Sequence, residues 1–164
     1  MEDEVDRLVA AWARERPDLD VRPLEVLSRV TRLARHLDRA RRTAFAAHDL
    51  ETWEFDVLAA LRRTGRPYAL SPGQLLAQTM VTSGTMTNRV DRLETRGLVQ
   101  RLPDPADRRG VRVRLTPRGK ERVDAALADL LERERGLLHG LSRPDQEVLS
   151  GLLRRLVLPF EGDA

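Results

Sequence analysis

The chain has 164 residues, of which 41% are hydrophobic, 4% are aromatic and 34% are charged, and its formal net charge is +3. This length suits one domain or two closely packed lobes, and the absence of cysteine excludes disulfides, thiolate catalysis and thiol-based redox sensing. No apolar run approaches the ~20 residues that span a bilayer, and the first nine residues are acidic where a signal peptide is basic. We therefore expect a cytoplasmic protein with no membrane partner.

The first fifty residues predict two amphipathic helices. Apolar residues with i, i+3, i+4, i+7 spacing indicate a helix that ends before Pro17, and they are Val5, Leu8, Val9 and Trp12. After a short linker, a longer apolar stripe predicts a second helix from Pro23 to about Ala47, formed by Leu24, Leu27, Val30, Leu33 and Leu37.

The middle of the chain predicts a helix-turn-helix. One helix begins near Asp49, a residue type that caps helix N-termini, and its inward face holds Trp53, Val57, Leu58 and Leu61. The next begins at Ser71, which forms a capping box with Gln74, and ends near Met80. A third helix lies within "TSGTMTNRVDRLETRG" and ends at Gly97. Two short helices joined by a tight turn are typical of a helix-turn-helix.

A β-ribbon follows this motif directly. The segments "LVQRL" and "VRVRL" alternate apolar and polar residues, which predicts two strands joined by a loop from Asp104 to Gly110. A long helix is then predicted from Thr116-Pro117 to about Arg135, and a last one from Ser142 to about Leu158. The predicted fold class is mainly α with a small β-ribbon, arranged as a winged helix-turn-helix.

This fold indicates DNA binding, because the major groove admits an α-helix and carries the sequence code on its base edges. One side of the third helix is predicted to pack inward through Met86, Val90, Leu93 and Gly97. The other side is small, polar and basic, and we predict DNA contacts from Ser83, Gly84, Thr85, Thr87, Asn88 and Arg92. At the tip of the ribbon, Arg108 and Arg109 suit a narrow, negative minor groove. An ordinary wet helix face and a solvated turn are the alternatives.

The stretch from Met86 to Gly119 resembles the recognition helix and wing of the MarR family of bacterial transcriptional regulators. The shared pattern is an apolar residue followed by Thr, then Arg-Leu, Gly-Leu-Val, an Asp-rich wing and Leu-Thr-Pro-x-Gly. The resemblance implies a single MarR-like domain over residues 1–164, in which residues 49–116 form the DNA-binding lobe and residues 1–48 and 117–164 form a helical dimerisation region. It also implies a homodimer on a double-stranded, pseudo-palindromic operator with half-sites ~34 Å apart. The apolar stripes at both chain ends are too large for one lobe to cover, which agrees with a dimer.

The N-terminal helix with its tryptophan resembles the urate-responsive branch of that family. This resemblance implies an effector site made of Trp12, Asp56, Arg89 and Arg101. A half-buried Asp56 would pair with Arg89, and a planar anion held by Trp12 and Arg101 would repel Asp56, shift Arg89 and weaken DNA binding. Each residue also has a simpler interpretation: Trp12 anchors the first helix, Asp56 and Arg89 form a structural ion pair, and Arg101 contacts phosphate.

Other functional classes fit the sequence less well. It has no Gly-rich phosphate loop and no nucleophile elbow, and His36, His48 and His139 do not have metal-ligand spacing. We therefore expect neither an enzyme nor a bound cofactor or metal. The expected function is a ligand-responsive repressor that a small anionic metabolite such as urate releases from its operator. A small polycarboxylate or phenolic effector, or a DNA-binding protein without any ligand, is the alternative.

Overall fold

The computed structural model describes residues 2–79, 82–105 and 107–161. Its strands are β1 (Ala69–Leu70), β2 (Val99–Asp104) and β3 (Asp107–Leu115). Its helices are α1 (Glu4–Glu15), α2 (Pro23–Ala46), α3 (Thr52–Arg63), α4 (Pro72–Thr79), α5 (Ser83–Thr95), α6 (Pro117–Leu138) and α7 (Arg143–Val157), followed by a 3₁₀ turn over Leu158–Phe160.

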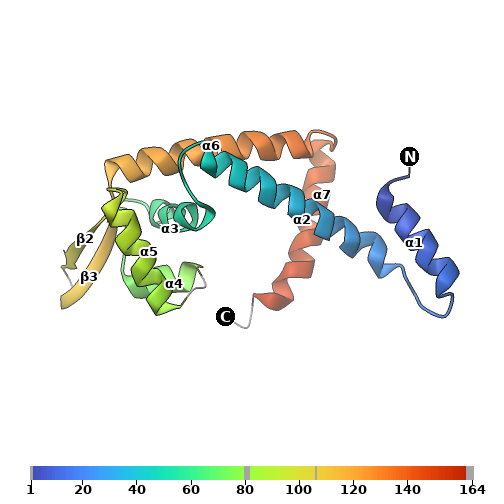
Figure 1. Cartoon of the computed structure of the whole chain (residues 1–164), viewed down its shortest axis with the longest axis horizontal. Helices are drawn as coiled ribbons and strands as arrows, with labels where there is room; N and C mark the ends of the chain where they lie inside the picture. The colour runs from blue at the N-terminus through green and yellow to red at the C-terminus, as the bar shows by residue number, and fades with distance from the viewer. Residues whose placement is uncertain (1, 80–81, 106, 162–164) are drawn as a thin grey trace.

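The long helices α2 and α6 pack together and connect the two ends of an elongated chain (Figure 1). One end carries a lobe made of α3, α4, α5 and the β2–β3 ribbon, and the other end carries α1. The mainly helical winged helix-turn-helix predicted from the sequence is therefore confirmed. In the described part of the chain, no helix combines the length and apolar composition needed to cross a bilayer.

Helix α3 begins later than predicted. Its N-cap is Glu51, and Asp49 instead lies in the preceding turn with a φ of 54°. The side chain of Glu54 accepts a hydrogen bond from the backbone N–H of Glu51 at 2.9 Å, which satisfies one free donor at the helix start. Asp49 is not available for this role because its carboxylate binds Arg96 and Arg122.

The sheet has one strand more than predicted and a shorter wing loop. The strand order is β1-β3-β2, and all pairs are antiparallel. The two-residue β1 is too short to leave an alternating pattern in the sequence. Pairing of β2 with β3 continues past a register shift to Asp104 and Asp107, so the backbone of Arg108 and Arg109 belongs to β3. Their side chains, like the predicted helix end at Met80, lie outside what the structure describes.

The described buried residues of the lobe form one hydrophobic core, to which each of its helices and strands contributes. Phe45 of α2 stacks on Phe55 of α3 with their ring centroids 4.0 Å apart. The residues predicted to pack inward from α3 and α5 are buried, namely Val57, Leu58 and Leu61 with Met86, Val90 and Leu93. Trp53 is only partly buried, and Gly97 is exposed at the end of α5 with a φ of 67°. Helix α5 is thus fixed to the lobe through one face and leaves the other free.

Polar contacts attach α1 to the N-terminal half of α2. Arg29 forms ion pairs with Asp3 at 2.9 Å and with Asp6 at 2.6 Å, and Arg32 pairs with Glu4 at 2.6 Å. Val5 is buried, but Trp12 keeps 49% of its surface exposed. The apolar face of α1 is therefore only partly covered within one chain.

Candidate nucleic-acid interface

The free face of α5 carries the residues that the sequence analysis assigned to DNA. All six of them are exposed: Ser83, Gly84, Thr85, Thr87, Asn88 and Arg92. Thr87 donates a hydrogen bond to the backbone oxygen of Ser83 at 3.2 Å. Apart from the flanking residues and the backbone of α5, no described atom lies within 4 Å of where a Cβ on Gly84 would be. The face is therefore open enough for the backbone and short side chains to approach a groove closely.

A hollow of about 580 Å³ lies beside this face and was not predicted. The start of α3 forms its far side through Glu51 and Trp53, and α5 supplies Gly84, Thr85, Asn88, Arg89 and Arg92. Trp53 was predicted to be an ordinary core residue because its spacing matches the inward face of α3. Spacing alone does not separate a fully buried tryptophan from one that covers the core and also presents a face of its ring.

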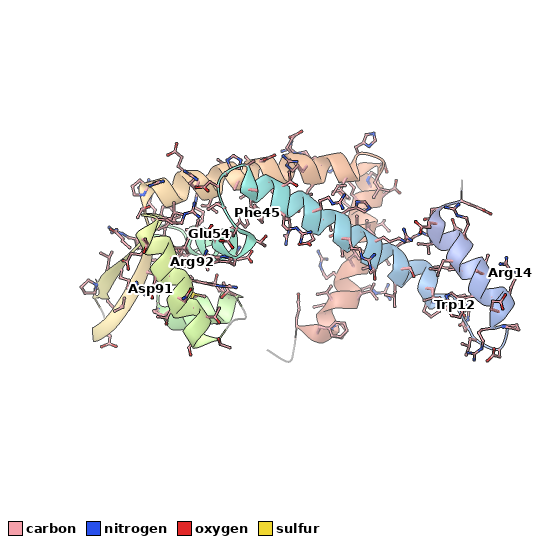
Figure 2. All side chains as sticks on the ribbon, in the orientation of Figure 1. Trp12, Arg14, Phe45, Glu54, Asp91 and Arg92 are labelled. Carbon is pink, nitrogen blue, oxygen red and sulfur yellow. The ribbon has the colours of Figure 1, made fainter. Side chains whose placement is uncertain are left out.

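Trp53 and Glu51 hold two arginines of α5. The guanidinium carbons of Arg92 and Arg89 lie 4.7 Å and 5.5 Å from the Trp53 ring centroid, within cation–π distance. Glu51 accepts hydrogen bonds from Trp53 Nε1 and from Arg92 Nη2, each at 2.8 Å. The bond from Trp53, supported by Arg92, lowers the pKa of Glu51. Both guanidinium-bearing side chains therefore line the hollow beside the exposed face of α5, and Figure 2 labels Arg92 there.

A buried ion pair fixes the C-terminal end of α5. Glu54 is 1% exposed, and its two carboxylate oxygens lie 2.6 Å and 2.5 Å from Arg96 Nη1. Arg96 Nη2 also donates to the backbone oxygen and the carboxylate of Asp49, each at 2.6 Å. Arg122 of α6, followed by Arg96, lowers the pKa of Asp49. The start of α3 thus holds the C-terminal half of α5, through Trp53 on Arg89 and Arg92 and through Glu54 on Arg96.

The structure does not bring the four predicted effector residues together in one chain. Asp56 is exposed and not half-buried, and among the described residues no ion pair joins it to Arg89, which turns toward Trp53 instead. Partial desolvation by the surrounding protein raises the pKa of Asp56. Three positive charges lower the pKa of Asp56 in opposition to this effect, and they belong to Arg41, Arg89 and Arg63. Arg89 therefore acts on Asp56 through its charge without direct contact.

Arg101 and Trp12 lie far from each other. Arg101 reaches back from β2 to α5, where it pairs with Asp91 at 2.5 Å and with Glu94. Its backbone N–H also donates to Glu94 Oε1 at 2.8 Å. Trp12 lies at the opposite end of the chain from Asp91 (Figure 2). An effector site that uses all four residues requires more than one chain.

Comparison with known proteins decides the family. The profile of the MarR family matches residues 48–110, from the turn before α3 into β3. The HTH-type transcriptional regulator PecS of Dickeya dadantii (strain 3937) is 40% identical over 153 residues, which are 93% of this chain and 92% of PecS. The chain belongs to the MarR family. As a MarR-family protein it is a DNA-binding transcription regulator and not an enzyme.

Two further known proteins are similar to most of this chain. The HTH-type transcriptional repressor NicR of Pseudomonas putida is 31% identical over 143 residues, 85% of this chain and 89% of NicR. A crystal structure of a MarR mutant from E. coli in complex with operator DNA matches with a TM-score of 0.68 at 27% identity, over 84% of this chain and 95% of that one.

The contacts of Trp53 predict a measurable role in DNA binding by this MarR-family chain. Replacing Trp53 with leucine removes both cation–π contacts, each worth ~0.5–1 kcal/mol at an exposed site, and should weaken binding to a selected operator about fivefold. Trp53→Phe keeps a ring under the arginines and should bind within about twofold of the parent. Fluorescence anisotropy with labelled duplex measures both. Equal affinities for the leucine variant and the parent would show that the ring does not position Arg92.

Proposed function

We propose that the chain is a homodimeric repressor that binds a pseudo-palindromic operator and releases it when a small anionic metabolite binds. The observation that carries this proposal is the free face of α5, which is small, polar and basic and lies next to the β2–β3 wing. Such a face suits base edges and phosphates. NicR is named a repressor, which supports repression as the outcome of binding. The MarR mutant was crystallised with operator DNA, which supports operator DNA as the partner.

Exposed apolar helix faces support a homodimer. Along α7, Val148, Leu152 and Leu156 are four residues apart and are 63%, 50% and 50% exposed, so they form one apolar stripe on that helix. Leu27 of α2 and Leu131 of α6 are also exposed. Surfaces of this kind are typical of protein–protein contacts, and a two-fold dimer places two α5 helices in successive major grooves ~34 Å apart.

The proposed interface assigns base contacts to α5 and contacts with the A·T-rich flanks to the wing, so substitutions in the two should have different effects. Asn88→Ala removes a side chain suited to base edges, so it should cost ~1–3 kcal/mol of operator binding and relax the base preference at one position. Arg108→Ala and Arg109→Ala should weaken binding mainly where the flanks are rich in A·T. Binding of selected duplexes over a salt series measures these effects, and affinity should fall steeply as salt rises. Identical behaviour of helix and wing variants on every duplex would contradict the assignment, and a stable monomer that ignores DNA would contradict the function.

We propose that the effector acts on the lobe through Asp56, Arg89 and Arg101. Arg101 already binds the α5 carboxylates of Asp91 and Glu94. An anion that binds Arg101 competes with those carboxylates, so it loosens the support of the recognition helix. In an elongated chain with α1 at one end and the lobe at the other, a two-fold axis through the middle brings α1 of a second copy toward this lobe. Trp12 of the second copy is then the residue that stacks on the effector.

Effector release provides the test of this site. At least one of urate, xanthine, hypoxanthine, citrate and aconitate is expected to dissociate the operator complex, as measured by anisotropy. Asp56→Asn should bind DNA but respond less, because a neutral amide is not repelled by an incoming anion. Arg101→Lys keeps a positive charge beside α5 but loses the planar fork, and should also respond less. Effector binding should also change the fluorescence of Trp12, and Trp12→Phe is the control for that signal because Trp53 fluoresces as well. A parent-like response in both Asp56→Asn and Arg101→Lys would exclude this site. No release by any of these anions, nor by phenolic compounds, would favour a DNA-binding protein that has no ligand.

A further inference from the structure

A second hollow, of about 460 Å³, lies on the face of the β2–β3 ribbon that points away from α5. Successive side chains of a strand point to opposite faces, and Arg101 of β2 points toward α5. The preceding residue, Gln100, therefore points away from α5, and it pairs in register with Arg114 of β3. Both residues line the hollow. This site is separate from the residues assigned above to DNA and to the effector.

The rim of the hollow has an excess of positive charge. Arg66, Arg114 and Lys120 line it, and none of the carboxylates that the structure describes does. Lys120 pairs with Asp124 at 2.7 Å, but Asp124 also pairs with Arg62 at 2.7 Å. With the Gln100 amide oriented so that its oxygen faces Arg114, it accepts from Arg114 Nε at 2.8 Å, which satisfies the donor without neutralising the charge. Within the described ranges, no carboxylate forms an ion pair with Arg66 or Arg114.

Apolar groups also line the hollow. They come from Tyr68, Pro67 and Pro117, and the guanidinium carbon of Arg62 lies 5.0 Å from the centroid of the Tyr68 ring. Tyr68 has a φ of 59°, a conformation that bulky residues rarely adopt. Two backbone hydrogen bonds maintain it, from Leu115 N to Tyr68 O at 3.0 Å and from Tyr68 N to Gly65 O at 2.7 Å. A strained residue held by its surroundings in a pocket is a feature of ligand sites.

We propose that this hollow binds a small aromatic molecule that carries a phosphate group. The guanidinium of Arg114 and the ammonium of Lys120 suit the phosphate oxygens, and Tyr68 and the prolines suit a planar ring. A bound ligand touches both strands of the wing through Gln100 and Arg114. The concave shape and the position away from α5 favour a small molecule over the DNA backbone. Binding here requires neither operator DNA nor the effector site proposed above.

Two residues allow a direct test, because Tyr68 is the only tyrosine and Lys120 the only lysine of the chain. NMR spectra of protein labelled at tyrosine rings and at lysine therefore report one residue each. Phenyl phosphate is the probe. The matched controls are inorganic phosphate, which lacks the aromatic ring, and phenol, which lacks the phosphate group. We expect saturable shifts of both signals with phenyl phosphate, at a dissociation constant about tenfold lower than for either control.

Variants locate the binding. Arg114→Gln and Lys120→Gln should each weaken phenyl phosphate binding about tenfold, as expected when a charged hydrogen bond is lost. Arg118→Gln removes the same charge from the same end of α6 outside the hollow and should leave binding unchanged. The proposal is overturned by an absence of saturable shifts, by equal affinity for phenyl phosphate and phosphate, or by parent-like binding in both rim variants. It is also overturned if only operator DNA shifts the NMR signal of Tyr68 and if that shift requires Arg114 and Lys120. The hollow would then be a contact with nucleic acid.

Discussion

Replacing Glu54 with alanine is expected to lower the free energy of unfolding by about 3–5 kcal/mol, because it leaves a partly buried guanidinium without its main partner. Glu54 is buried and binds Arg96 through both carboxylate oxygens, and it also accepts the backbone N–H of Glu51 at the start of α3. One substitution therefore removes a helix cap and an ion pair together. Urea unfolding followed by circular dichroism measures the change.

A second glutamate of the chain provides the control for Glu54. Glu147 of α7 pairs with Arg143 at 3.3 Å, but the two side chains are 71% and 90% exposed. Exposed pairs of this kind contribute little, so Glu147→Ala should change the free energy of unfolding by no more than ~0.5 kcal/mol. Similar losses for the two variants would mean that burial of Glu54 does not determine its contribution. Because Arg96 follows α5 directly, Glu54→Ala should also weaken operator binding at temperatures where the variant is still folded.

Replacing Gly119 with alanine is expected to lower the free energy of unfolding by about 3 kcal/mol, the upper part of the range for overpacking a core. A Cβ at this position would lie 2.0 Å from the backbone oxygen of Leu98 and 3.0 Å from Leu115 Cδ1. The Leu98 oxygen cannot move aside easily, because it accepts the N–H of Thr116 at 3.1 Å, where α6 begins. The first turn of α6 would have to shift away from the sheet.

Gly136 provides the matched control on the same helix. Apart from its chain neighbours and the backbone of α6, no described atom lies within 4 Å of where its Cβ would be. Gly136→Ala should therefore raise the free energy of unfolding by about 0.5 kcal/mol, since alanine favours the helical state. Thermal or urea unfolding of the two variants should move in opposite directions. Destabilisation by both would mean that a general intolerance of α6, and not the contact with Leu98, explains the loss at Gly119.

The sequence was sufficient for the fold because its signals are periodic and local. The inward spacing of Met86, Val90 and Leu93 identified the buried face of α5, and thereby also the free one. Boundaries were less accurate where tertiary contacts decide them. Asp49 has the chemistry of an N-cap, but Arg96 and Arg122 lie far along the chain and take its carboxylate, so Glu51 and Glu54 complete the helix start instead.

The candidate site was predicted only in part, and for the same reason. Exposed residues of α5 follow directly from helix geometry, whereas the partners of Arg89 and Arg101 depend on how separate elements pack. The guanidinium of Arg89 lies over the Trp53 ring, and Arg101 pairs with the carboxylates of Asp91 and Glu94. The pattern of charges in a sequence does not rank such competing partners, because their distances are set only after folding. The hollow at Tyr68 left no motif, since its lining comes from a turn, two strands and the start of a helix.

Helix α7 has a consequence for how the protein responds to concentration. None of its 15 residues is buried within the chain, and an isolated helix of ~12–15 residues is only marginally stable in water. If a second copy covers its apolar stripe, the folding of α7 and the pairing of two chains are one equilibrium. Dilution then unfolds α7, as a denaturant would. In a cell that makes little of the protein, a fraction of the molecules then has an unfolded C-terminal helix.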